Sequence, residues 1–249
     1  MNRRQLASSI VVALVAMLFA VSVQLTFSPQ IIFRDDFATE HVALSWVRTV
    51  GFGAVNQSGG VLTLESLSHG SDRPSEVLIS SEILFTSDRF FVSYRVMPAV
   101  LPRRGVCGLV GAVTGFTVGI TYVKEGWYWS YWEPAARDWR ATAIRAVEGI
   151  WYVVRWTVSP TQVMITVWDD DSGMELGSHS VSLVTRQTIR LTLGTFAWGE
   201  GNCSARWDYV EIRIDPRGYQ WIFLAMASML LVVDITVLVH WSKRKPSRY

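Results

Sequence analysis

The sequence predicts an all-β domain, a jelly-roll β-sandwich, held between two transmembrane helices. Three observations lead to this prediction. Long apolar runs occur at both ends of the chain, short stretches of alternating apolar and polar residues fill its middle, and turn residues separate those stretches. Alternation with period two is typical of half-buried strands. Many short strands with frequent turns between them are typical of sandwiches and jelly rolls.

The two apolar runs predict helices that cross a membrane. The run from Leu6 to Phe27 has no charge, and the run from Tyr219 to Trp241 has a single carboxylate. A bilayer core needs roughly 20 apolar residues in a helix. We therefore expect an N-terminal signal-anchor or transmembrane helix over residues 1–27 and a C-terminal transmembrane helix over residues 218–242. A cleaved signal peptide stays an alternative for the first run.

The basic residues that flank these runs predict the orientation. Arg3 and Arg4 precede the first run, and a basic tail over residues 243–249 follows the second. Basic residues are retained on the cytoplasmic side. Both termini are therefore expected to be cytoplasmic, with residues 28–217 extracellular at the plasma membrane and the lipid bilayer as one partner. The net charge of +2 is small and gives no indication of nucleic-acid binding.

The extracellular segment contains alternating runs rich in β-branched and aromatic residues, which pleated and half-buried surfaces favour. These runs lie at residues 60–65, 89–96, 150–158, 163–167, 189–195 and 207–214. No linker divides the segment and no internal repeat is present, so a single β-domain is expected.

An aromatic stretch, GWYWSYWEP, begins at Gly126. If residues 121–133 form one strand, the odd positions are the more apolar face and belong to the core. The even positions then carry Tyr128 and Trp132 toward water or a ligand, and Trp139 follows closely enough to join them. Rings with a polar handle are common in binding surfaces. Plain packing, contact with a sugar and contact with another protein remain open for these rings.

Two cysteines and two glycosylation sequons fall in the extracellular segment. Cys107 and Cys203 predict a disulfide, since thiols outside the cell tend to oxidise. Two buried free thiols are the alternative. The sequons at Asn56 and Asn202 are acceptors if the chain meets a glycosylating pathway.

Five further stretches carry a resemblance to a known superfamily. They are FRDDF (33–37) with SW (45–46), GGVLTL (59–64), and the late runs RLTLGTFAWG (190–199) and WDYVEIRI (207–214). Together they resemble the concanavalin A-like jelly rolls, which include laminin-G-like modules, legume lectins and bacterial laminarinases. The resemblance implies that the first and last strands are neighbours. It also implies a sugar-binding concave face, for which Tyr128, Trp132 and Trp139 are the candidates.

The same resemblance raises a calcium site, since members of the superfamily often bind calcium beside the sheet. Asp35 or Asp36, together with Asp208, would supply the oxygen ligands that this ion prefers. The favoured alternative is that Asp36 and Asp208 bond to the backbone or to arginine at the strand ends. No other cofactor is expected.

Catalytic patterns are missing from the sequence. The laminarinases use Glu-x-Asp-x-x-Glu on one strand, and this spacing does not occur here. The acidic cluster at residues 169–171 adjoins Ser172 and Gly173, which indicates a solvated turn. No histidine stands in a metal-ligand spacing. The sequence therefore predicts a protein that is not an enzyme.

One carboxylate in the second apolar run bears on function. Asp234 costs roughly 2.5–3.5 kcal/mol near the centre of a membrane helix, and the first run has no cation to pair with it. A contact with another membrane subunit would relieve that cost. The alternative is a carboxyl group that is protonated or that reaches toward the cytoplasmic interface. The sequence thus favours a non-catalytic accessory or structural subunit of a membrane or cell-surface complex. The alternative function is a lectin-like, glycan-binding protein of the cell surface.

Overall fold

The computed structural model describes residues 30–39, 46–67, 74–81, 85–86, 89–113, 116–182, 188–198 and 201–214. Residues 31–214 form one compact unit. Both predicted membrane runs, with Asp234, lie outside the described residues, as do the basic tail and the exact domain ends. Among the described residues, no helix is long and apolar enough to cross a bilayer.

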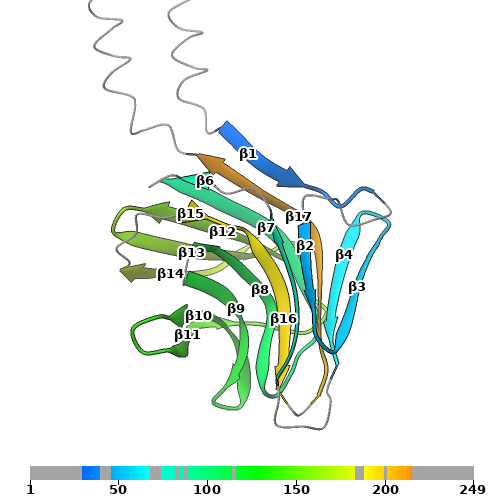
Figure 1. Cartoon of the computed structure of the whole chain (residues 1–249). Coiled ribbons are helices and arrows are strands. Elements are labelled where there is room, and N and C mark those ends of the chain that lie inside the picture. Colours follow the sequence, from blue (N-terminus) through cyan, green and yellow to red (C-terminus); the bar gives the residue numbers. More distant parts are fainter. Residues whose placement is uncertain are drawn as a thin grey trace, which may run out of the picture. The chain divides into compact units, whose positions relative to one another are not determined.

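The domain consists of two antiparallel sheets that form a sandwich, so the all-β prediction is confirmed. Sheet A has the strand order β14-β13-β12-β7-β17-β4-β3, and β1 also pairs with β17. Its strands are β1 (Gln30–Asp35), β3 (Gly53–Ser58), β4 (Val61–Ser66), β7 (Phe90–Val100), β12 (Tyr152–Ser159), β13 (Gln162–Asp169), β14 (Glu175–Ser182) and β17 (Cys203–Ile214). The first and last strands are therefore neighbours, as the resemblance implies (Figure 1).

Sheet B has the strand order β11-β10-β9-β8-β16-β5-β2. Its strands are β2 (Trp46–Val50), β5 (Pro74–Ser81), β8 (Gly105–Val113), β9 (Phe116–Val123), β10 (Gly126–Glu133), β11 (Asp138–Arg145) and β16 (Thr192–Trp198). In Figure 1, β9, β8 and β16 run side by side through this sheet. A short ladder of β6 (Phe85–Thr86) and β15 (Thr188–Ile189) is separate from both sheets.

Aromatic rings from both sheets interlock in the core. Phe116 of sheet B meets Trp156 of sheet A edge to face, with ring centroids 5.6 Å apart. Trp129 of sheet B meets Tyr152 of sheet A in the same way at 5.6 Å. All four rings are buried. Edge-to-face pairs add to the free energy gained by burying the ring area, so these contacts help to hold the two sheets together.

The strand predictions hold except at the aromatic stretch. Each of the six alternating runs overlaps a strand, namely β4, β7, β12, β13, β16 or β17. The prediction of one strand over residues 121–133 is wrong, because β9 and β10 form a hairpin that turns at Lys124 and Glu125. Both residues have positive φ, 49° and 65°. Tight hairpin turns of this kind usually carry Asn or Gly, so Lys124 and Glu125 are not a recognisable turn signal.

Candidate functional site

The two faces of β10 separate its aromatic residues. Trp129 is fully buried, and Trp127 and Tyr131 pack against the core from the same face. Because side chains alternate along a strand, Tyr128 and Trp132 lie on the outer face of sheet B. This is the division that parity along the stretch predicts, and both outer rings remain partly exposed.

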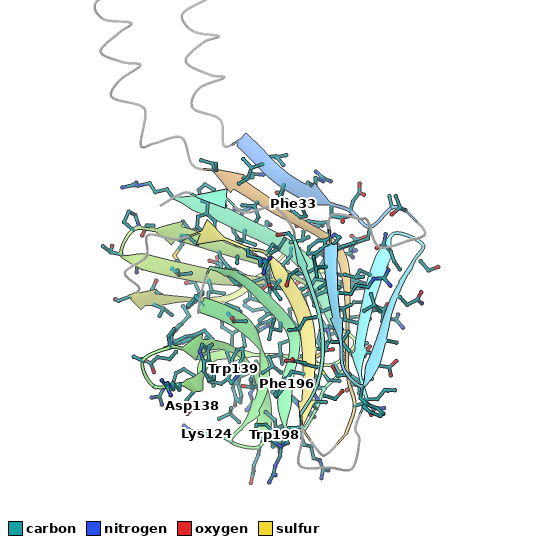
Figure 2. All side chains as sticks on the ribbon, viewed as in Figure 1. Phe33, Lys124, Asp138, Trp139, Phe196 and Trp198 are labelled. Atoms are coloured by element: carbon teal, nitrogen blue, oxygen red, sulfur yellow. The ribbon has the colours of Figure 1, made fainter. Side chains whose placement is uncertain are left out.

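The β10–β11 pairing brings the three predicted platform residues onto one surface. Trp132 is directly opposite Trp139, and their rings meet edge to face with centroids 5.9 Å apart. Tyr128 lies four residues before Trp132 on the same face, which is roughly 13 Å along a strand. Arg145, opposite Tyr128, places its guanidinium 5.8 Å from the centre of the tyrosine ring. We call Tyr128, Trp132 and Trp139 the aromatic platform; Figure 2 shows Trp139 on the β10–β11 hairpin.

Small residues form the floor beside the aromatic platform. Ser130 and Thr121 are buried side by side on β10 and β9, and their hydroxyl oxygens are 2.6 Å apart. Gly119 is paired with Ser130. A Cβ atom on Gly119 would lie 2.3 Å from Cγ1 of Val106, which leaves no room for a larger residue without a shift. The floor therefore stays low between the rings.

A second aromatic pair lies on the outer face of the same sheet, on β16. Phe196 and Trp198 meet edge to face with ring centroids 6.1 Å apart, and Trp198 is 47% exposed. Both appear in Figure 2 on β16. Strands β9 and β8 separate β16 from β10, a distance of roughly 14 Å at the usual strand spacing. The floor thus runs between two aromatic groups.

Charged residues occur at the end of the β10–β11 hairpin. Arg140 Nε donates to Glu133 Oε2 at 2.7 Å. This hydrogen bond and the charge of Glu133 raise the pKa of Arg140, and the charge of Asp138 adds to the shift. Asp138 is directly opposite Glu133 across the hairpin. The pair is well exposed, so it contributes little to stability. Side chains alternate along a strand, so Glu133, Asp138 and Arg140 project from the face opposite Trp132 and Trp139.

The predicted calcium ligands have protein partners instead. Asp208 accepts a hydrogen bond from Arg95 at 2.8 Å, and Asp36 accepts one from the backbone nitrogen of Ala38 at 3.3 Å. Asp35 accepts from the indole of Trp46 at 2.6 Å. Within the described residues, no group of three or more acidic, histidine or cysteine side chains is placed to hold a metal. As placed, these residues do not fit a calcium site, and calcium binding stays an untested expectation.

The two cysteines lie in facing sheets, on β8 and β17, and both are buried. In the structure they are free thiols, so the predicted disulfide is not formed. Cys107 Sγ donates to the carbonyl of Ser204 at 3.2 Å, and Cys203 Sγ donates to that of Val106 at 3.4 Å. Burial raises the pKa of the Cys203 thiol well above its usual value, and the neighbouring Cys107 raises it further. The two thiols are direct neighbours, as the partners of a disulfide must be, so the pairing of Cys107 with Cys203 stays a prediction.

The remaining predicted sites stay predictions. Asn56 on β3 and Asn202 before β17 are both exposed, which a glycosylated asparagine requires. Asp234 lies outside the described residues.

Sequence reasoning also missed several residues of the outer face. Arg145 and the floor residues Gly119, Thr121 and Ser130 become neighbours of the platform only through the hairpin, and Trp198 was not singled out.

Comparison with known proteins supports the fold. No family model matches the chain, and no curated protein matches its sequence. Among solved structures, the catalytic domain of an endo-1,3-beta-glucanase (laminarinase) from Thermotoga petrophila RKU-1 is similar. Its TM-score is 0.53 at 11% identity, over 76% of this chain and 98% of that one. The CBM2 module of Lactobacillus casei BL23 phage J-1 evolved Dit has a TM-score of 0.54 at 12% identity, over 75% and 96% of the two chains.

Other matches are to parts of larger proteins. The chain spans only 17% of a sialidase, and that match covers 68% of this chain with a TM-score of 0.50 at 14% identity. It spans 38% of a xylan beta-1,4-xylosidase from Bacillus Halodurans C-125, and that match covers 72% of this chain with a TM-score of 0.52 at 14% identity. At such identities the likeness establishes the fold alone. The jelly-roll resemblance is therefore confirmed at the level of the β-sandwich.

The comparison corrects two predictions. A non-catalytic accessory or structural subunit and the absence of enzymatic activity were both expected from the sequence. The similar structures are mostly glycoside hydrolases, among them family 16 glucanases and an endo-β-galactosidase. Both predictions are therefore corrected, because the chain shares its fold mostly with such enzymes, and the glycan-binding alternative agrees with these neighbours better; at 10–12% identity the likeness shows the fold alone. The missing Glu-x-Asp-x-x-Glu spacing was a poor guide because it excludes only one arrangement of the two carboxyl groups that glycosidases use.

Proposed function

We propose that this domain is carbohydrate-active and binds an oligosaccharide along the outer face of sheet B. The aromatic platform beside a low floor of Gly119, Thr121 and Ser130 is the observation that carries the proposal. Flat rings stack on the apolar faces of sugar rings. The floor hydroxyls of Ser130 and Thr121 are buried and bonded to each other, so the floor contributes its low shape and not hydrogen bonds to the sugar. The similar structures support the same chemistry, since several of them act on glycans by name.

The geometry favours an extended ligand over a single sugar. Tyr128 and Trp132 are roughly 13 Å apart along β10, and Phe196 with Trp198 continues the aromatic surface on β16. Tyrosine and tryptophan also lose few rotamers on binding, which keeps the entropic cost of contact low. Arg145 beside Tyr128 adds hydrogen-bond donors to the surface. A chain of several sugar units would contact more of these groups than a monosaccharide.

Hydrolysis of a glycosidic bond is the second candidate. Glycosidases use two carboxyl groups that flank the scissile bond. Glu133 and Asp138 face each other across the β10–β11 hairpin. Because side chains alternate along a strand, they project from the face opposite the platform rings, so a hydrolytic role would require them to reach the ligand around the end of the hairpin. The solved hydrolases of the same fold support testing this activity. Glu133 is already paired with Arg140, so its release from that pair would be part of any catalytic role.

For location, we propose the outer surface of the cell membrane. The support comes from the sequence alone, namely the two apolar runs and their basic flanks. In this arrangement the domain would present its glycan-binding face outside the cell. A protease added to intact cells should then remove the domain and leave both termini protected, and an extracellular tag at the C-terminus would contradict the topology.

A glycan array probed with the full-length protein tests the proposed function. We expect binding to a class of oligosaccharides, and we expect Trp132→Ala to weaken that binding. Trp168→Ala is the matched control, because Trp168 is a partly exposed tryptophan of sheet A with an arginine over its ring. The proposal fails if no glycan binds, or if both variants lose binding equally. Release of reducing ends from the bound glycan, abolished in Glu133→Gln or Asp138→Asn, would identify hydrolysis.

A further inference from the structure

An open cavity of about 220 Å³ lies on sheet A, away from the aromatic platform. It is lined by Arg34 of β1 and by Tyr209, Glu211 and Arg213 of β17. The three residues of β17 alternate along the strand, and Val210 and Ile212 between them are buried in the core. The cavity therefore opens on the outer face of sheet A, where the first and last strands of the domain pair.

The charges in this cavity are unbalanced. Glu211 forms an ion pair with Arg213, with Glu211 Oε1 2.8 Å from Arg213 Nη2, and the Glu211 side chain is only 10% exposed. Arg34 is exposed and forms no ion pair within the residues that the structure describes. Two guanidinium groups thus face one carboxylate, so the cavity carries a net positive charge.

Arg213 also presents a donor that needs an acceptor. Its Nε is buried and has no hydrogen-bond partner among the described residues. Buried donors are nearly always paired in native proteins, so this atom indicates a missing acceptor. Glu211 holds the far end of the guanidinium, which fixes the direction of the remaining N–H groups. Arginine forks of this kind suit the oxygens of phosphate groups.

The position of the cavity in the chain indicates which phosphate-containing ligand lies within reach. Arg34 lies seven residues after Phe27, and Arg213 lies six residues before Tyr219. Phe27 is the last residue of the first apolar run and Tyr219 is the first residue of the second. The sequence predicts that both runs enter the bilayer. Even a fully extended chain spans roughly 25 Å over seven residues. Basic residues this close to a membrane are attracted to anionic lipids in the leaflet that faces them, and the attraction falls off within a Debye length.

We propose that the cavity formed by Arg34, Tyr209, Glu211 and Arg213 binds the phosphate of an anionic phospholipid headgroup. Arg34 attracts the headgroup, and Arg213 donates hydrogen bonds to its oxygens from a direction that Glu211 fixes. This site uses strands of the other sheet, so it is independent of the proposed glycan function. It would hold the domain against the surface of the membrane into which its two ends are predicted to run.

The test uses the full-length protein in an uncharged polyoxyethylene detergent. Native mass spectrometry and calorimetry follow titration with dihexanoyl-phosphatidylglycerol, dihexanoyl-phosphatidylcholine and inorganic phosphate. We expect phosphatidylglycerol to bind most tightly. Arg34→Gln should weaken its binding about tenfold, the size of one charge-assisted hydrogen bond. Arg34 is exposed, so this variant should fold normally.

Controls separate the possible outcomes. Arg206→Gln changes an exposed arginine of the same strand that does not line the cavity, and it should bind phosphatidylglycerol like the unaltered protein. Trp132→Ala should also leave lipid binding unchanged. Equal binding by the Arg34→Gln and unaltered proteins would overturn the proposal, as would equal affinity for the two lipids. Inorganic phosphate that binds as tightly as phosphatidylglycerol would overturn the lipid as the source of the phosphate.

Discussion

The two faces of β10 carry similar rings in different surroundings. On the inner face, Trp129 is fully buried and contacts Tyr152 of the opposite sheet. On the outer face, Trp132 and Tyr128 stay partly exposed, and Trp132 contacts Trp139 of the neighbouring strand. One side of a single strand thus holds the sandwich together, and the other side leaves its rings partly exposed on the outer face of sheet B.

The difference shows that residue type alone does not separate packing from binding. Tryptophan occurs on both faces, and only the alternation of the strand decides which ring is covered. The rule also predicts different costs of substitution. Inner-face changes should lower the free energy of unfolding, whereas outer-face changes should leave stability nearly intact and alter ligand binding.

The largest effect is expected at the inner face. Trp129→Ala should lower the free energy of unfolding by about 3–5 kcal/mol, because it removes a buried ring and leaves a cavity. Thermal or urea unfolding measures the change. Trp129→Phe should cost much less, since it keeps an aromatic ring and removes an indole N–H that has no partner among the described residues. An Ala variant as stable as the unaltered protein would contradict the assignment of this face.

The next effect concerns the inner faces of β8 and β17. Oxidation of Cys107 and Cys203 to a disulfide should stabilise the domain by about 2–4 kcal/mol relative to the reduced form. Peptide mapping of the native protein under non-reducing conditions should find the linked pair, and unfolding with and without reductant gives the difference. Two free thiols in protein isolated from its native compartment would show that the reduced state in the structure is the native one.

A smaller effect is expected at the outer floor. Ser130→Ala removes the hydrogen bond between Ser130 and Thr121, whose oxygens are 2.6 Å apart. The loss should cost about 1 kcal/mol, the usual net contribution of such a bond. Chemical unfolding measures it. Thr121→Val is the companion variant, and the double variant should cost less than the sum of the two. Strict additivity would mean that the two hydroxyls do not interact.

The smallest effect lies away from both faces of β10, at the turn after β13. Ser172 donates to Asp169 from its backbone nitrogen at 2.8 Å and from its hydroxyl at 2.7 Å, and these bonds lower the pKa of Asp169. A pKa lowered by folding stabilises the protein above the unfolded pKa, and this stabilisation is lost as the pH falls through the folded pKa. Ser172→Ala should make the acid-side loss of stability slightly smaller, measured by unfolding between about pH 2 and pH 6.

The fold class could be predicted because half-buried strands leave a period-two record in the sequence. The runs that became β7, β12 and β17 show this record clearly, and parity alone placed Trp129 inside and Trp132 outside. The hairpin at Lys124 and Glu125 could not be predicted, because neither residue type usually adopts positive φ. Pairing of Trp132 with Trp139 depends on that turn.

Other parts of the site depend on contacts between strands far apart in sequence. Ser130 and Gly119 become neighbours through the same hairpin. Trp198 belongs to the same surface because β16 pairs with β8 in sheet B. Spacing along the chain carries no record of such contacts. The missing Glu-x-Asp-x-x-Glu spacing excludes one linear arrangement of carboxylates and no other, so it did not justify the prediction that the protein lacks enzymatic activity.

Oxidative footprinting of the full-length protein with a bound oligosaccharide tests the central claim most directly. Mass spectrometry compares the oxidation of each ring with and without the ligand. The account predicts protection of Tyr128, Trp132 and Trp139, while Met174, which is 60% exposed at the β13–β14 turn, oxidises at an unchanged rate. Unchanged oxidation of all three platform rings, with protection at residues of sheet A instead, would contradict a glycan site on the outer face of sheet B.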